Sequence, residues 1–258
     1  MSLVSCDTKL AARWRASPNF QPRRNGLVPN ILLMHYTGME SAKAALDHLC
    51  HEQSGVSCHY LVDEEGQIIQ MVAESQRAWH AGQSHWAGQE DINSCSIGIE
   101  IVHEGHIPEM DDFPDRQIEA VIALSRDIFS RHAIPPRHVL AHSDVAPERK
   151  KDPGEKFPWR YLHEQGIGHY VPPIAPKGET GFYVGDEDEK VEQMRKMLRN
   201  YGYKVDSQGP FDQKDADLIT AFQRHFRPQK VDGRLDQSTF ETAQKLVDSL
   251  SSAACASA

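Results

Sequence analysis

Short apolar runs in the first two thirds of the chain predict strands. Residues 31–34 are continuously apolar, which is typical of a strand buried on both faces of a sheet, and His35 ends this run. A second short apolar run leads to His142 in the same way. Side chains at the carboxyl ends of strands in an α/β sheet point toward the crevice where ligands bind, so the two histidines are candidates for one site.

Two further patterns predict strands in the same part of the chain. Residues 57–62 and 67–72 flank an acidic turn that ends in Gly66, and this arrangement predicts a β-hairpin. Residues 96–102 alternate between apolar and polar positions and carry Glu100 inside the strand.

Two amphipathic segments are interleaved with these strands. Ser41 is an N-cap candidate for a helix that runs to His51, and residues 115–132 place apolar side chains at helical spacing before Pro135 ends the pattern. Strands interleaved with helices indicate an α/β domain, with a mixed central sheet flanked by helices. Residues 7–29 show no periodicity, and we expect an irregular segment there.

The composition changes after residue 170. Residues 171–185 are rich in proline and glycine and predict a linker, and three amphipathic stretches punctuated by glycines follow it. We therefore expect an α/β domain in residues 1–170, a small three-helix domain in residues 186–251 and a flexible tail in residues 252–258.

Length, charge and cysteine content narrow the classes of function. A chain of 258 residues suits two domains, and its formal net charge of -9 speaks against a nucleic-acid-binding protein. The five cysteines form no CxxC pair and indicate neither a disulfide framework nor a thiolate zinc site. No stretch is long and apolar enough for a membrane span, and the first residues lack an export signal. These features predict a cytoplasmic protein, or one of the periplasm or outer-membrane envelope if the natural N-terminus was trimmed.

One turn near residue 150 carries the strongest signal for chemistry. It contains His142 and, ten positions later, Asp152 directly before Pro153 and Gly154. Histidine and aspartate held on a rigid turn are common zinc ligands. Together with His35 they would make a set of three ligands that leaves a fourth position for water, as in catalytic zinc sites. From the residues alone, two unrelated strand-end histidines are an equally good interpretation.

Five motifs together resemble one known family. The segments ILLMHYTG, VSCHYLVDEEGQIIQMV, RAWHAG, SIGIEIV and AHSDVAPERKKDPG occur in this order between about residues 17 and 159. They are similar to the zinc-dependent N-acetylmuramoyl-L-alanine amidases of the type-2 family, which includes phage amidases and animal peptidoglycan-recognition proteins. The C-terminal segment is similar to the three-helix peptidoglycan-binding module that accompanies many such hydrolases, although its usual Asp-Gly-x-Phe-Gly turn reads SQGPFD here, at residues 207–212.

The resemblance implies the composition of a metal site. It makes His35, His142 and Asp152 the ligands of one Zn²⁺ ion per chain and Glu100 the catalytic glutamate. Hydrolysis of an unstrained amide needs a strong nucleophile at neutral pH and stabilisation of an oxyanion. Zinc lowers the pKa of a bound water to ~7, and Glu100 would take the water proton and pass it to the leaving amine.

The resemblance also implies a catalytic lysine two residues before the aspartate ligand. That position is Lys150, whose charge would stabilise the oxyanion, and the adjacent Lys151 is the alternative.

The RAWHAG motif places an aromatic residue, Trp79, beside a small turn, which suits a groove for a sugar-peptide ligand. A core position for Trp79 is nearly as good an interpretation. The residues predicted to bind substrate are Trp79, His80, Ala81 and Asn93.

The implied reaction is hydrolysis of the amide bond between N-acetylmuramic acid and L-alanine in peptidoglycan or muropeptides, in wall degradation or recycling. Two alternatives belong to other classes. One is a peptidoglycan sensor that binds without cutting, and the presence of all the implied ligands and catalytic residues argues against it. The other is a different zinc amide hydrolase, a peptidase or deacetylase that acts on wall fragments, which the identity of the products would distinguish.

Overall fold

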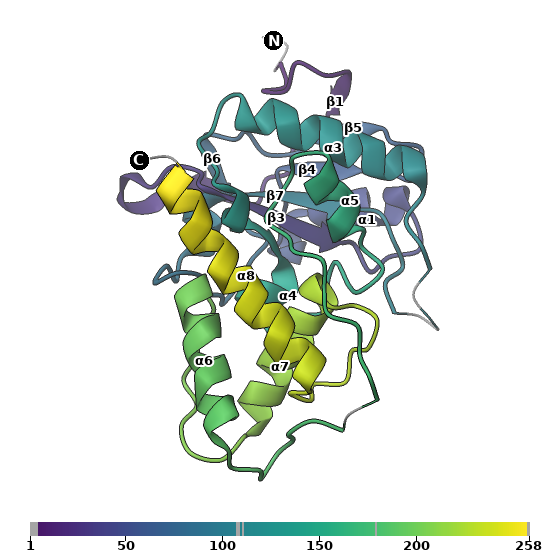
Figure 1. Ribbon diagram of the computed structural model, residues 1–258. Coiled ribbons are helices and arrows are strands. Elements are labelled where there is room, and N and C mark those ends of the chain that lie inside the picture. The colour runs from purple at the N-terminus through teal and green to yellow at the C-terminus, as the bar shows by residue number, and fades with distance from the viewer. Residues whose placement is uncertain (1–4, 107–108, 110, 179, 257–258) are drawn as a thin grey trace.

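A six-stranded sheet lies at the centre of the first two thirds of the chain in the computed structural model, which describes residues 5–106, 109, 111–178 and 180–256 (Figure 1). Across the sheet the strands follow in the order β1 (Ala12–Trp14), β5 (Ile68–Gln70), β4 (Tyr60–Val62), β7 (Ser96–Ile101), β3 (Ile31–Tyr36) and β8 (Val139–Ala141). The β4–β5 pair is antiparallel, as the predicted hairpin requires, and the other pairs are parallel. The prediction of a mixed central sheet is confirmed.

The two faces of the sheet pack against different helices. In β4, the side chains of Tyr60 and Val62 belong to the larger apolar core together with those of α3 (Asp115–Phe129). The intervening Leu61 points to the opposite face and packs with α1 (Ala42–Leu49). Both faces are therefore covered, as the continuously apolar strands predict.

The helices begin and end close to the predicted positions. Ser41 caps α1, because its hydroxyl oxygen accepts a hydrogen bond from the amide of Ala44. The next long helix, α3, ends at Phe129, three residues before the predicted end. The short helix α5 (Trp159–Glu164) lies beside α3 in Figure 1.

Short strands occupy part of the segment that the sequence predicts as irregular. Besides β1, the strand β2 (Phe20–Pro22) pairs antiparallel with β6 (Gln76–Ala78). Each of these strands has three residues, which is too short to show an alternating pattern in the sequence. The prediction for residues 7–29 is wrong at these positions.

Three helices form the C-terminal part of the chain, as predicted: α6 (Glu189–Tyr201), α7 (Gln213–Phe226) and α8 (Gln237–Ala256). In the described residues between 165 and 188 the connection contains neither a helix nor a strand, and it runs along the helical region in Figure 1. Because α8 extends to Ala256, most of the predicted tail of residues 252–258 is helical, and residues 257–258 lie outside the described part of the chain.

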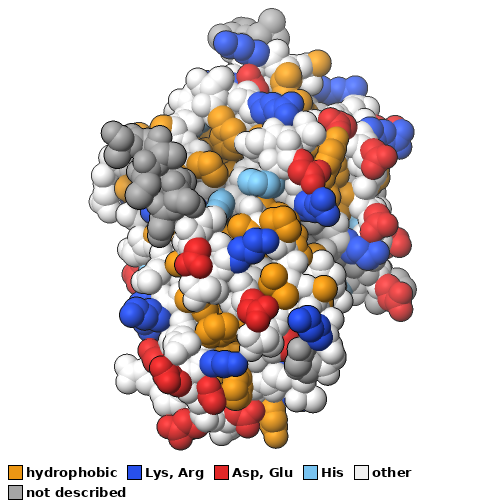
Figure 2. Space-filling view, in the orientation of Figure 1, with side chains coloured by type: hydrophobic (Ala, Val, Ile, Leu, Met, Phe, Trp, Pro, Cys, Tyr) orange, Lys and Arg blue, Asp and Glu red, His pale blue; other side chains and the backbone are white. Residues whose placement is uncertain are grey.

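One apolar core continues from the sheet into the C-terminal helices. Trp86 and Trp159 of the sheet domain belong to the same cluster as Tyr203 and Phe226 of the helical region. The face in Figure 2 carries mixed charges, and acidic side chains gather at the far end of the helical region. Within the described residues, no helix combines the length and hydropathy that crossing a membrane would require.

Candidate active site

Two neighbouring parallel strands bring the first two candidate ligands together. β3 pairs with β8 in a register that places Met34 opposite Ala141. The next residues along the two strands are His35 and His142, so both side chains lie at the same end of the strand pair. The strand β8 stops there, and the short helix α4 (His142–Val145) begins with the histidine itself.

Asp152 reaches the same point from the loop that follows α4. A backbone hydrogen bond of 3.0 Å, from the amide of Ser143 to the carbonyl oxygen of Asp152, ties this loop to the helix. The Nδ1 atoms of His35 and His142 are 2.9 Å apart. The Oδ2 atom of Asp152 lies 3.0 Å from the first and 2.9 Å from the second. All three side chains are buried.

The spacing of these three atoms fits a tetrahedral zinc site. Ligand bonds of ~2.0–2.1 Å at tetrahedral angles place neighbouring ligand atoms ~3.3 Å apart, close to the separations found here. Burial and the neighbouring His142 lower the pKa of His35 to about 4, which keeps this imidazole neutral. Burial by itself would raise the pKa of Asp152, but the contacts with both imidazoles hold it well below its usual range. A carboxylate between two imidazoles is a donor set that suits a divalent cation.

The far nitrogen of each histidine ring is also held in place. The Nε2 atom of His35 lies 3.0 Å from Nδ1 of His80, and Nε2 of His142 lies 3.1 Å from the carbonyl oxygen of Ala81. Because both Nδ1 atoms face Asp152, the Nε2–H groups donate to these partners. Such contacts fix the tautomer and the ring orientation of metal-binding histidines.

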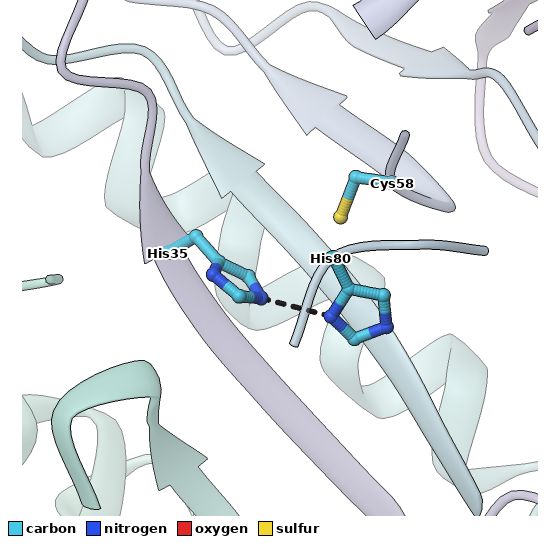
Figure 3. A group of neighbouring side chains, drawn as sticks. All are labelled: His35, Cys58 and His80. Carbon is cyan, nitrogen blue, oxygen red and sulfur yellow. Dashed lines mark hydrogen bonds between the residues drawn. The ribbon is translucent and has the colours of Figure 1, made fainter. Parts of the chain in front are cut away.

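A second group of candidate ligands shares His35 but has a different character. Figure 3 shows His35 and His80 joined by their hydrogen bond, with the sulfur of Cys58 beside them. Burial raises the pKa of the Cys58 thiol well above its usual range, which disfavours the thiolate form that binds metals. The other ring nitrogen of His80 lies 3.2 Å from the hydroxyl of Ser96. These contacts suit a group that supports His35 by hydrogen bonding.

A glycine in β7 makes room for this support. A Cβ atom on Gly98 would lie 2.6 Å from Nδ1 of His80 and 2.7 Å from the sulfur of Cys58. Any larger residue would push the His80 ring away from its place beside His35. The Gly-Ile-Glu sequence therefore contributes twice, through the space at Gly98 and through Glu100 two residues later.

Glu100 lies on the strand that flanks β3 on the side opposite β8. The β3–β7 register pairs Glu100 with His35. The Oε2 atom of Glu100 is buried and has no hydrogen-bond partner among the described residues. Burial, followed by the charge of Asp152, raises the pKa of Glu100 well above its usual range, and the charge of Lys150 partly opposes this rise. A partly buried carboxylate with a free oxygen and a raised pKa has the properties of a general base.

The two adjacent lysines differ in their relation to the centre. Both line the cleft over the ligands, but Lys150 is half-buried and Lys151 is exposed. The positive charge of Lys150 lowers the pKa of both Glu100 and His35, so this ammonium group lies within electrostatic reach of both. Its burial and its electrostatic influence distinguish Lys150 from Lys151 as the lysine nearer to the candidate ligands.

The cleft has a volume of 450 Å³, and two of the four predicted substrate-binding residues line it, Trp79 and His80. The indole nitrogen of Trp79 is buried without a partner among the described residues. Asn93 and Ala81 are not among the lining residues. The side-chain oxygen of Asn93 accepts hydrogen bonds of 3.0 and 2.8 Å from the amides of His80 and Ala81. Asn93 lies in the short helix α2 (Ile92–Cys95) and holds the turn that carries His80 and Ala81. A substrate contact by Asn93 or Ala81 stays a prediction.

The sequence gives no sign that His80 supports His35. The two residues are 45 positions apart, and no spacing pattern connects a loop histidine with a strand histidine. His35 and His80 belong to two different motifs of the same family resemblance, which does not separate a substrate contact from a ligand support.

Comparisons with known protein families match both parts of the chain. A family model described as N-acetylmuramoyl-L-alanine amidase matches residues 25–155, and one described as a putative peptidoglycan binding domain matches residues 187–242. The N-acetylmuramoyl-L-alanine amidase AmiD of Escherichia coli is 37% identical over 235 residues, which cover 84% of this chain and 82% of that protein.

Two solved structures with bound muropeptides share the arrangement of the whole chain. The complex of E. coli AmiD with the substrate anhydro-N-acetylmuramic acid-L-Ala-D-γ-Glu-L-Lys aligns with a TM-score of 0.73 at 35% identity, over 91% of this chain and 93% of that one. AmpDh3 from Pseudomonas aeruginosa, in complex with an anhydromuramic pentapeptide, aligns with a TM-score of 0.71 at 29% identity, over 97% and 99% of the two chains.

Proposed function

The chain belongs to the N-acetylmuramoyl-L-alanine amidase family, and from this premise we propose that it hydrolyses the amide bond between N-acetylmuramic acid and L-alanine, with one zinc ion held by His35, His142 and Asp152. The observation that carries the proposal is the convergence of three buried ligand atoms at separations of 2.9–3.0 Å. The Oε2 atom of Glu100 on the neighbouring strand has no hydrogen-bond partner in the described part of the chain, which supports a hydrolytic role over a binding role.

Muropeptides with an anhydro sugar are the substrate class that we propose for the cleft. The two similar structures hold anhydromuramyl peptides, and this chain covers more than nine tenths of each. Trp79 is partly exposed at the cleft, which suits an apolar face of the sugar or the lactyl group.

In the proposed reaction the metal ion and the residues around it have distinct roles. Zinc supplies Lewis acidity toward the amide carbonyl and toward the attacking water. Glu100 removes a proton from that water and delivers it to the leaving nitrogen of L-alanine, which its raised pKa favours. Lys150 places positive charge where the carbonyl oxygen becomes negative. The contacts of His80 and Ala81 with the two ligand histidines keep both rings in orientation.

The direct test is digestion of a defined anhydromuramyl tripeptide. We expect the zinc-loaded protein to release free tripeptide and anhydro-N-acetylmuramic acid, chelation to stop the release and added zinc to restore it. Chromatography of the digest follows both products. Full activity after exhaustive chelation would contradict the metal assignment, and tight binding of an intact substrate by the zinc-loaded protein would favour the sensor alternative.

The two lysines form a matched pair of variants. Lys150→Met should lower kcat by ~10²–10³-fold, because the charge that stabilises the oxyanion is lost, whereas Lys151→Met should keep nearly the activity of the natural protein. Steady-state kinetics on the same tripeptide substrate would measure both. A larger loss at Lys151 than at Lys150 would reverse the assignment.

A further inference from the structure

A second carboxylate on the ligand-bearing turn reaches the C-terminal helices. Asp144 lies two residues after His142 in α4 and is 1% exposed. Its Oδ1 atom accepts a hydrogen bond of 2.6 Å from the hydroxyl of Tyr203, and its Oδ2 atom lies 2.7 Å from Nδ1 of His225. The same Oδ2 accepts a hydrogen bond of 2.8 Å from the amide of Ala141. One side chain thus connects the first turn of α4 with two residues of the helical region.

The His225 ring is fixed by packing on both sides. It stacks on Trp159 with a centroid distance of 3.8 Å and on Phe226 with a distance of 3.9 Å. The side chain is 2% exposed. Because the ring is held between two aromatic partners, its Nδ1–H donates to Asp144 in a fixed direction.

Tyr203 is equally constrained by a loop of the sheet domain. The fully buried Trp86 packs edge-on against Tyr203 with a centroid distance of 4.8 Å. The amide of Ala87 donates a hydrogen bond of 2.7 Å to the carbonyl oxygen of Gly202. A Cβ atom on Gly202 would lie 2.7 Å from the Trp86 ring, so this turn accepts only glycine at its closest approach. The Tyr203 hydroxyl is therefore placed by the interface itself.

Arg224, the residue before His225, contacts the loop that follows the candidate ligand Asp152. The Nε atom of Arg224 lies 3.6 Å from Oε2 of Glu155, three residues after Asp152. Glu155 also accepts a hydrogen bond of 3.0 Å from His106, which lowers the pKa of its carboxyl group to about 2. Consecutive residues of α7 therefore contact the segments that follow two of the three ligands.

We propose that Tyr203 and His225 are positioning residues for the metal site, because through Asp144 they fix α4 and with it His142. The inference rests on the proposed zinc site. Without the two donors, Asp144 would be a buried carboxylate short of partners, and α4 would move to solvate it. The helical region is then part of the scaffold of the active site, which differs from a wall-binding module that can be removed without effect on the site.

Two substitutions of His225 separate the hydrogen-bond donor from the aromatic ring. His225→Phe keeps a ring on Trp159 but has no donor, whereas His225→Asn loses the ring and carries an amide N–H where Nδ1 lies. We expect zinc affinity to fall by ~10-fold or more in His225→Phe and in Tyr203→Phe, and to stay within about 3-fold of the natural value in His225→Asn. Competition with a chromophoric chelator on the full chain measures the affinity. The melting temperature should instead depend on the aromatic ring, and it should fall more in His225→Asn than in His225→Phe.

His169→Gln provides a matched control in the same interface. His169 lies 2.9 Å from the hydroxyls of both Tyr201 and Ser249 and has no contact with Asp144. The His169→Gln variant should have the zinc affinity of the natural protein, and its cobalt-substituted form should have the same visible spectrum. The cobalt spectrum of His225→Phe should change.

Three outcomes would count against the inference in distinct ways. Natural zinc affinity and cobalt spectrum in His225→Phe would overturn it. Equal losses of affinity in His225→Phe and His225→Asn would also overturn it, since they would reflect general destabilisation. Failure of the natural chain to bind zinc would overturn the proposed function and the inference together.

Discussion

Glu100→Gln should lower kcat by ~10²–10⁴-fold while the protein keeps one zinc ion. Glutamine has nearly the same shape as glutamate but cannot accept the proton of the attacking water. The free oxygen of Glu100 and its raised pKa suit that task, and the β3–β7 register pairs it with His35. Steady-state kinetics on an anhydromuramyl tripeptide, combined with metal analysis of the same preparation, measure both parts of the prediction.

A neighbouring glutamate on the loop after β7 controls for the loss of charge. Glu104 is exposed and does not line the cleft, so Glu104→Gln should have the activity of the natural protein. Natural turnover in Glu100→Gln would remove this residue from the mechanism. Loss of zinc together with activity would assign it to the integrity of the metal site instead.

Asp152→Ala should lower zinc affinity by more than ~10²-fold and abolish hydrolysis. Even the removal of a residue that only supports a ligand typically costs 10–100-fold in metal affinity, and Asp152 is the single carboxylate in the set. Two imidazoles would remain in a buried site without the carboxylate that balances the charge of the cation. Metal analysis after dialysis against a weak chelator measures the occupancy, and the tripeptide assay measures the activity.

Cys58→Ala distinguishes the two groups of candidate ligands that share His35. Cys58 belongs to the second group and has a thiol whose pKa is raised by burial, so its loss should leave zinc content at about one ion per chain. The opposite pattern, with metal lost from Cys58→Ala and kept in Asp152→Ala, would move the metal to the His35–Cys58–His80 group.

The strands, the long helices and the strand-end positions of the two histidines follow from patterns that local sequence carries. Runs of apolar residues that end in His35 and His142 predict two strand ends, and the hairpin and the long helices follow from turn residues and helical spacing. The adjacency of the two histidines depends on the pairing of β3 with β8, across 107 positions of sequence. Only the resemblance to a family connects residues at that separation.

The parts that could not be predicted are contacts between buried polar groups. From the sequence, His80 and Asn93 are predicted substrate contacts and Asp144 has no predicted role. Each makes its hydrogen bonds to a segment that is distant along the chain or on another element. The strands β1 and β2 were missed because three residues carry no periodicity. Polar residues that support a site therefore need the structure before they can be assigned.

The bond that we expect this chain to cut is the amide between the lactyl carbonyl of N-acetylmuramic acid and the nitrogen of L-alanine. Digestion of an anhydromuramyl tripeptide in water enriched in oxygen-18, followed by mass spectrometry of both products, tests it most directly. We expect one heavy oxygen in the lactyl carboxylate of the sugar and an unlabelled tripeptide with a free N-terminal amine. Heavy oxygen in a carboxylate newly formed within the peptide, or in released acetate, would contradict it.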